Sequence, residues 1–257
     1  MKRGRISKIE MNMLLGKFPK KRMPLSKEYQ KIYEKHYSEN RNAKTIASKA
    51  AAFMEGWGHK QVARTVGKMK PRGSTLEIGA GTLNQFRFER KTGRYDIVEP
   101  YKILYENSQF RKLIDHVYID ISDIPLCEKY DRITSVYCFE HILDLPDVIQ
   151  KAALLLSDNG VFSIAIPNEG RFLWRFAYQN TSGREFRRRY GLDYDVMMHY
   201  EHVNTADEIE ILLRYYFKKV DMKLFGIGRE LAFYRYFCCS GPIYSRCSKP
   251  KNKELIK

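Results

Sequence analysis

Residues 75–82 of the chain are Thr-Leu-Glu-Ile-Gly-Ala-Gly-Thr, a short apolar strand that carries a carboxylate and runs into a glycine turn. Glu99 follows twenty residues after Gly79, at the end of the next predicted strand. Glycines let a ligand approach the backbone closely, because no Cβ stands in the way. An acid at the second strand end can accept hydrogen bonds from ribose hydroxyls. The pattern therefore predicts an open α/β sheet that holds an adenosine-containing cofactor.

The spacing of the turn separates two classes of cofactor. A dinucleotide fold requires G-x-G-x-x-G, and Asn84 occupies the third glycine position here. Glu77, two residues before the first glycine, instead suits a ligand end with a positive charge, such as an amino group. The segment resembles the first motif, (E/D)-x-G-x-G, of the class I S-adenosylmethionine-dependent methyltransferases. The resemblance implies S-adenosylmethionine as the cofactor and assigns to its binding Glu77, Gly79, Ala80, Gly81, Asn84 and Glu99.

Strands and helices alternate along the middle of the chain, which is typical of a parallel sheet. The residue patterns predict strands at 74–79, 95–99, 116–120, 131–137, 160–166, 218–224 and 231–237. They predict helices near 84–90, 101–107, 144–157 and 205–216, with Gly160 just past the end of the third. Together with the resemblance, this order predicts a Rossmann-like, seven-stranded, mostly parallel sheet with helices on both faces and an antiparallel hairpin at one edge.

The chain divides into a central domain and two basic flanks. We predict a helical extension over 1–72, with helices at 26–38 and 43–68, a methyltransferase domain over 73–240 and a tail over 241–257. Residues 1–24 mix basic and apolar side chains, which suits either a strap laid over the domain or an amphipathic segment on a membrane surface. Residues 168–204 interrupt the alternation and are predicted to cover the site.

Later segments extend the resemblance over roughly residues 73–225. Val117–Pro125 resembles the third motif of the family, in which Asp120 and Ile121 would contact the adenine. Tyr130–His141 resembles the fourth motif and adds Cys138 to the predicted cofactor site. All these residues follow strands, and ligands of such sheets bind at the carboxyl ends of the strands.

The family moves a sulfonium methyl to a nucleophile, and a sugar or aliphatic hydroxyl needs a base to remove its proton. His141 is the first candidate, because an imidazole with a pKa of about 6.5 accepts a proton at neutral pH. Glu140 adjoins it, and His202 is a further candidate that can return over the pocket and join the pair; the alternative is that His202 is a packing or loop histidine. The alternative is that Glu140 and His141 only order the cofactor and its loop.

A metal site is not predicted. In some ubiquinone-pathway O-methyltransferases and small-RNA 2′-O-methyltransferases, an acid three residues before such a Glu-His pair completes a magnesium site. Tyr137 stands at that position here, and a phenol is no replacement for a carboxylate.

Aromatic and arginine residues are frequent between 168 and 204. Arginine forks match phosphate or carboxylate oxygens, and aromatic rings can stack on a sugar or form a lid. The predicted substrate-binding residues are Trp174, Arg184, Arg187 and Arg188; the alternative is a solvated basic loop. This part of the chain resembles bacterial methyltransferases of surface-polysaccharide or lipid-linked glycan pathways. The resemblance implies O-methylation of a small molecule or glycan.

The net charge of +16 is concentrated on the flanks. Residues 1–70 hold 18 Lys/Arg against 5 Asp/Glu, whereas residues 71–170 hold 11 against 15. This asymmetry favours an anionic partner, such as a phosphate-bearing acceptor or the inner, anionic face of a membrane; the alternative is a plain solvated surface. It also allows RNA methylation as an alternative function, although no RNA-binding module is recognisable. A third alternative is a non-catalytic cofactor binder. The five cysteines and the lack of a signal sequence predict a cytoplasmic protein with reduced thiols.

Overall fold

The computed structural model describes residues 7–39 and 46–247, with the backbone alone for 34–39 and 46–53. The ends of the two predicted flanks, 1–6 and 248–257, therefore lie outside the described residues, as does the predicted start of the second helix at 43–45. Within the described part of the chain, no helix has the length and apolar character needed to cross a membrane. All five cysteines are free thiols.

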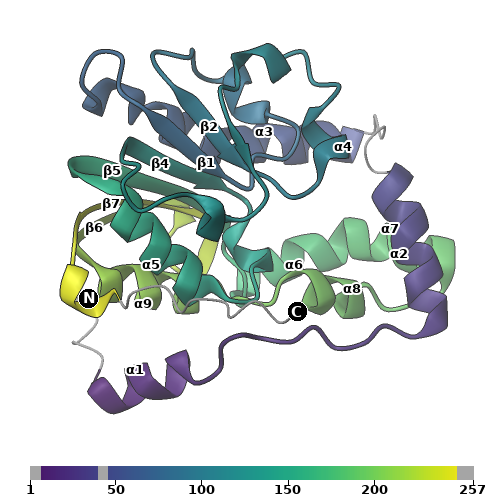
Figure 1. The fold of residues 1–257 in the computed structure, drawn as a ribbon. Coiled ribbons are helices and arrows are strands. Elements are labelled where there is room, and N and C mark those ends of the chain that lie inside the picture. The colour runs from purple at the N-terminus through teal and green to yellow at the C-terminus, as the bar shows by residue number, and fades with distance from the viewer. Residues whose placement is uncertain (1–6, 40–45, 248–257) are drawn as a thin grey trace, which may run out of the picture.

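Seven strands form one sheet in the order β3-β2-β1-β4-β5-β7-β6 (Figure 1). β7 runs antiparallel to both of its neighbours, whereas the other pairings are parallel. The predicted fold class is confirmed, including the antiparallel hairpin at the edge. The strands are β1 (Thr75–Ile78), β2 (Tyr95–Val98), β3 (Val117–Tyr118), β4 (Tyr130–Val136), β5 (Leu156–Pro167), β6 (Phe217–Ile227) and β7 (Leu231–Pro242).

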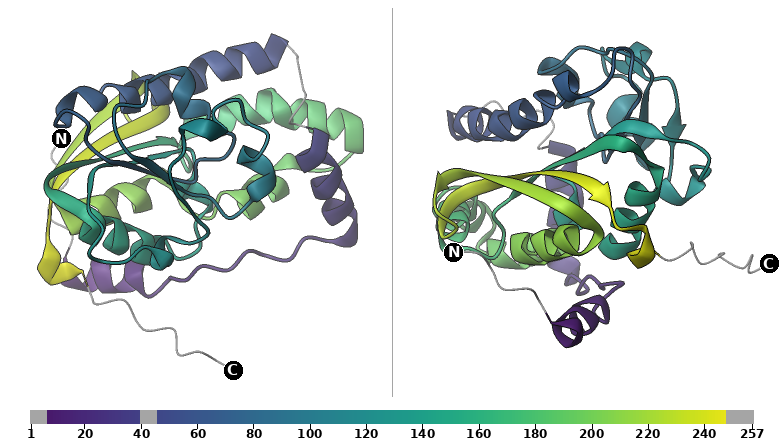
Figure 2. Two further views of the ribbon diagram at one scale, coloured as in Figure 1. Left: turned by 45° about the horizontal axis from the view of Figure 1, so that its top comes forward. Right: turned by 90° about the vertical axis from the view of Figure 1, so that its left-hand side faces the viewer.

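Helices cover both faces of the sheet, as Figure 2 shows. α5 (Leu145–Leu155) and α9 (Ala206–Tyr216) pack on one face, where Leu76, Ile133 and Phe162 enter the largest apolar cluster. α3 (Ile46–Ala63) packs on the other face against β4, β5 and β7. Thr205 and Glu208 form the predicted capping box at the start of α9.

Two of the predicted helices differ from the structure. The helix expected near 84–90 is a short 3-10 helix, Asn84–Arg87, and the one near 101–107 is the single turn α4 (Lys102–Tyr105). Gly160 does not cap α5, because Leu156 is already extended and pairs with Tyr130 at the start of β5. The apolar run thus passes directly from helix into strand.

The segment 168–204 forms three helices, α6 (Phe172–Asn180), α7 (Ser182–Tyr190) and α8 (Tyr194–Glu201). Residues of α2 (Lys27–Glu39) pack against α7 and α8 around Leu25, Phe186 and Met197. α1 (Lys8–Leu15) inserts Leu14 into the main core, so the N-terminal residues run along the domain from α1 to α2 (Figure 1).

Candidate functional site

A cleft of about 1140 Å³ opens at the carboxyl ends of the parallel strands. One wall comes from the glycine turn and the segment after β2, and the other from the end of β4, α2 and α8. Its lining residues are Tyr33, Thr82, Asn84, Arg87, Ile103, Leu104, Asn107, Ser108, Gln109, Phe110, His141, Tyr194, Met197, Met198, Glu201 and His202. The volume exceeds that of most single-ligand pockets, so it leaves room for a cofactor and an acceptor together.

The two glycines of the turn are required for different reasons. Gly79 has φ +71°, and a Cβ there would lie 2.2 Å from Cys138 Sγ, so only glycine fits against the end of β4. Gly81 has φ +50°, and a Cβ there would meet no protein atom within 4 Å. This open space is compatible with the cradle that an adenosine-binding fold needs, so the residues present fit a nucleoside cofactor; its contact with Gly81 remains our prediction.

Glu99 ties this turn to the end of β2. The backbone N–H of Gly81 donates to its Oε2 at 2.8 Å, and that of Tyr101 donates to its Oε1 at 3.0 Å. Each carboxylate oxygen keeps a second lone pair, which is what a pair of ribose hydroxyls would use. Glu99 as the ribose ligand remains our prediction.

Glu77 is buried beneath the turn and is not part of the cleft lining. Its Oε2 accepts a hydrogen bond of 2.8 Å from the hydroxyl of Tyr95. Burial raises the pKa of Glu77 to about 8, against the opposing effect of the Tyr95 hydrogen bond. A carboxyl that is largely neutral at pH 7 is a poor counter-charge for an amino group, so this placement favours a supporting role for Glu77 under the glycine turn.

The raised pKa of Glu77 predicts a pH-dependent stability. Between the ordinary pKa of 4.5 and about 8, the folded protein holds a proton that the unfolded chain releases, so stability falls as pH rises. Glu77→Gln should abolish this contribution. In urea unfolding, the free energy of unfolding of the variant minus that of the wild type should rise by up to about 1.4 kcal/mol per pH unit between pH 5 and 8. Glu106→Gln, an exposed control, should show no such trend; a constant difference for Glu77→Gln would refute the assignment.

The remaining predicted cofactor residues lie around the same strand ends. Ala80 and Ile121 are buried, and Asn84 lines the cleft. Asp120 is exposed and caps the 3-10 helix Ile121–Asp123 by accepting the Ser122 N–H at 2.8 Å. The thiol of Cys138 packs against Gly79, and burial raises its pKa to about 12, which keeps it protonated.

The chain turns sharply after β4 and projects a Glu-His pair toward the cleft. Tyr137 has φ +52°, an uncommon conformation for a non-glycine residue, and its hydroxyl donates to the backbone oxygen of Glu55 at 2.8 Å. The 3-10 helix Phe139–His141 follows. The turn therefore directs Tyr137 toward α3 and leaves Glu140 and His141 at the strand end.

The buried side chain of Asn204 fastens the segment after α8 to this 3-10 helix. Its Nδ2 donates to the backbone oxygens of Phe139 (2.8 Å) and Ile142 (2.7 Å). The backbone N–H of Val203 donates to the Glu140 oxygen at 2.8 Å. These bonds bring His202, which is 61 residues away in sequence from His141, to the end of β4.

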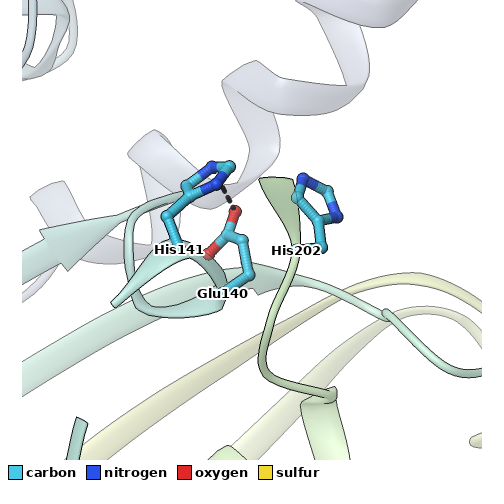
Figure 3. Close-up of side chains that lie close together, drawn as sticks. All are labelled: Glu140, His141 and His202. Carbon is cyan, nitrogen blue, oxygen red and sulfur yellow. Dashed lines mark ion pairs between the residues drawn. The ribbon is translucent and has the colours of Figure 1, made fainter. Parts of the chain in front are cut away.

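Glu140, His141 and His202 form one cluster, hereafter the Glu-His-His cluster (Figure 3). One ligand atom of each side chain lies within 4.8 Å of the other two. His141 Nε2 is 3.8 Å from Glu140 Oε1, and the two imidazole centroids are 4.9 Å apart. His141 and His202 line the cleft, whereas Glu140 is buried behind them. The structure thus joins the three residues predicted to be catalytic.

Both imidazoles are oriented through Nδ1. His141 Nδ1 lies 2.9 Å from the backbone oxygen of Glu201, and His202 Nδ1 lies 2.7 Å from Glu169 Oε2. Burial disfavours the charged form of His141, but Glu201 and Glu140 outweigh it and raise its pKa above the usual value. Glu169 is half-buried, and although burial raises the pKa of its carboxyl, its hydrogen bonds from His202 and Trp174 hold the pKa below the usual value.

The predicted substrate residues do not line the cleft. Trp174 donates to Glu169 Oε2 at 2.8 Å and stacks on the His202 ring with centroids 6.4 Å apart, so it supports the cluster from behind. Arg184, Arg187 and Arg188 are exposed on α7, whose buried residue Phe186 faces α2 and α8. Their contact with an acceptor remains a prediction.

The wall of the cleft opposite the glycine turn contains residues that the sequence did not single out. They are Tyr33 of α2 and Tyr194, Met197, Met198 and Glu201 of α8. The four from α8 fall within the segment 168–204 that was expected to cover the site, but nothing in their spacing distinguishes them from ordinary core residues. Tyr33 reaches the cleft only because α2 packs against α7 and α8.

Comparison with known proteins identifies the family. A family model described as a methyltransferase domain matches residues 47–214, which is more than half of the chain. No curated protein matches in sequence. The plantazolicin methyltransferase BpumL, solved with a pentazolic desmethylPZN analogue and S-adenosylhomocysteine (SAH), is 14% identical with a TM-score of 0.56 over 81% of this chain and 90% of BpumL.

Two further solved structures are similar to parts of this chain. A possible exported protein from Bordetella parapertussis is 11% identical with a TM-score of 0.53, over 90% of this chain and 78% of that one. The CurJ carbon methyltransferase is 15% identical with a TM-score of 0.49; the match covers 70% of this chain and only 53% of CurJ. Its activity therefore says nothing about the acceptor here. The family match, the sheet and the glycine turn together establish that the chain belongs to the class I S-adenosylmethionine-dependent methyltransferases.

Proposed function

We propose that the enzyme methylates a hydroxyl oxygen of a small-molecule or glycan acceptor. The observation that carries this proposal is the Glu-His-His cluster on the wall of the cleft, at the strand end after β4. A hydroxyl loses its proton as it is methylated, and a carboxylate beside two imidazoles is suited to promote that loss. A thiol, with a pKa of about 8.5, ionises far more readily than a hydroxyl, and a neutral amine attacks through its own lone pair, so sulfur and nitrogen acceptors depend less on such a group.

The reaction balances with one proton released. When bound, S-adenosylmethionine supplies the methyl group: its C–S bond breaks, a C–O bond forms, and SAH and a methyl ether result. The cleft aligns the acceptor oxygen behind the methyl carbon, which is the main contribution required of the protein. The cluster accepts the hydroxyl proton or promotes its loss, and His141 is the first candidate for the proton acceptor.

Charge supports an anionic acceptor, such as a surface-polysaccharide or lipid-linked intermediate. Arg184, Arg187 and Arg188 present guanidinium groups to solvent on α7, and the N-terminal 70 residues are strongly basic. Such groups favour phosphate-bearing acceptors and peripheral contact with an anionic membrane face.

Isotope transfer tests the acceptor class. The enzyme is incubated with methyl-¹³C S-adenosylmethionine in four parallel reactions, each with one class of acceptor: lipid-linked glycans, nucleotide sugars, peptides or bulk RNA. We expect labelled methyl on oxygen in a glycan or sugar fraction, assigned by NMR. Label on carbon or nitrogen would refute O-methylation. Label in RNA, with binding that weakens steeply with salt, would favour the RNA alternative.

A further inference from the structure

The Glu-His-His cluster has the composition of a metal site whose ligands come from two distant parts of the chain. Glu140 and His141 follow β4, and His202 follows α8. We propose that these three side chains bind one divalent transition-metal ion, with Zn²⁺ as the model, and leave a coordination position open to the cleft. The proposal deepens the proposed function by naming how that site activates the hydroxyl, and it rests on that function only for its catalytic consequence.

The first argument is the state of Glu140. Its side chain is 2% exposed, and among the described residues nothing hydrogen-bonds its Oε2. A buried carboxylate oxygen without a donor is costly, and a cation in contact with it removes that cost. The neighbouring imidazole of His141, at 3.8 Å from the other oxygen, is too distant for a hydrogen bond.

The second argument is the orientation of the imidazoles. Each ring uses Nδ1 for a partner outside the cluster, which is the Glu201 backbone oxygen for His141 and the Glu169 carboxylate for His202. Metal-binding histidines are held in this way, because the bond at one nitrogen fixes the tautomer and leaves the lone pair of the other for the metal. Trp174, which donates to the same Glu169 oxygen, fixes this partner in turn.

The donor set selects the kind of metal. Two imidazoles and one carboxylate suit zinc, iron, cobalt and nickel, whereas magnesium prefers oxygen ligands. Tyr137, at the position where a further carboxylate would be needed for an oxygen-rich site, donates its hydroxyl to Glu55 of α3 instead. In the part of the chain that the structure describes, the cluster therefore lacks the further oxygen ligands of a magnesium site, while its three ligands are sufficient for a zinc-like ion.

The distances allow the site to close around an ion. With bonds of about 2.0–2.2 Å in a tetrahedral arrangement, ligand atoms lie about 3.3 Å apart. The present atoms lie within 4.8 Å of one another, so the side-chain ends would move together by at most about 1.5 Å. Since His141 and His202 line the cleft, the open position faces the acceptor.

A bound ion would change the role of His141. The acceptor hydroxyl would enter the open position, and its pKa would fall as that of a zinc-bound water does. In that state His141 is a ligand, and the ion rather than the imidazole promotes loss of the proton. With or without a bound ion, the acceptor oxygen would lie at the Glu-His-His cluster.

Metal titration of the full-length, metal-free protein tests the proposal without cofactor or acceptor. Co²⁺ is the probe, because its visible absorption reports the ligand set, and calorimetry with Zn²⁺ and Mg²⁺ accompanies it. We expect one Co²⁺ and one Zn²⁺ per chain, and Mg²⁺ binding at least about 100-fold weaker. His202→Ala should lose at least about 100-fold in Co²⁺ affinity, and Glu169→Gln about 10- to 100-fold.

His199→Ala is the matched control, because His199 lies on α8, is exposed and is outside the cluster; it should bind Co²⁺ as the wild type does. Thermal unfolding confirms that each variant is folded. If His202→Ala is not folded, His202→Gln replaces it in the metal titration. No stoichiometric binding by the wild type, equal binding by the His202 variant, or tighter binding of Mg²⁺ would overturn the proposal. If methyl still reaches oxygen without bound metal, the catalytic role of the metal is wrong and O-methylation stands; if metal binds but methyl reaches carbon or nitrogen, O-methylation alone is wrong.

Discussion

Gly81→Ala lowers the affinity for S-adenosylmethionine and SAH by about 10- to 100-fold while the protein stays folded. The added methyl meets no protein atom within 4 Å, so it occupies the space that the cofactor needs. Forcing an extra methyl into a packed contact costs about 1–3 kcal/mol, which corresponds to this loss of affinity. Calorimetry measures the affinity, and thermal unfolding measures the fold.

Gly79→Ala is the matched comparison for this prediction. Its Cβ would lie 2.2 Å from Cys138 Sγ, so this variant should lose stability as well as cofactor affinity, and Cys138→Gly in the same chain should restore part of the stability. The assignment of the cofactor to the space above Gly81 is wrong if Gly81→Ala binds SAH as tightly as the wild type.

His141→Ala should lower kcat by about 10²- to 10⁴-fold, the range for loss of a group that manages a proton in the transition state. The affinity for S-adenosylmethionine should stay within about twofold, because the prediction places His141 on the acceptor side. Steady-state kinetics with the acceptor found by isotope transfer, together with calorimetry, separates the two effects.

His199→Ala again provides the control, since its Nδ1 lies 2.7 Å from the backbone oxygen of Asp195, away from the cleft lining. Its kcat should equal that of the wild type. An unchanged kcat for His141→Ala would assign His141 to ordering of the loop, the alternative that the sequence left open.

The sheet could be predicted from the sequence because the patterns that specify its elements are local. The glycine turn, the apolar strands and the capping box at Thr205 each specify an element from a few neighbouring residues, and the structure confirms them. Glu140 and His141 were expected at the cofactor edge because they follow a strand of the parallel sheet. His202 follows α8, and its place beside them depends on the bonds from Asn204 and Val203 to the 3-10 helix after β4.

The rest depended on long-range packing. Whether Glu77 faces the ligand or Tyr95 is decided by the side chains of β2, and sequence spacing carries no such information. The arginines of α7 lie outside the cleft lining, because Phe186 is the residue of that helix that is buried toward α2 and α8; their contact with an acceptor stays a prediction. Gly160 suggested a helix end, yet an extended Leu156 made that cap unnecessary.

Calorimetric titration of the wild-type protein with S-adenosylmethionine tests the central claim most directly. We predict one site per chain with a dissociation constant of about 1–100 µM, the range common for enzyme substrates. The absence of binding in a folded, full-length sample would contradict the assignment of this chain as a methyltransferase that uses the glycine turn at residues 79–81.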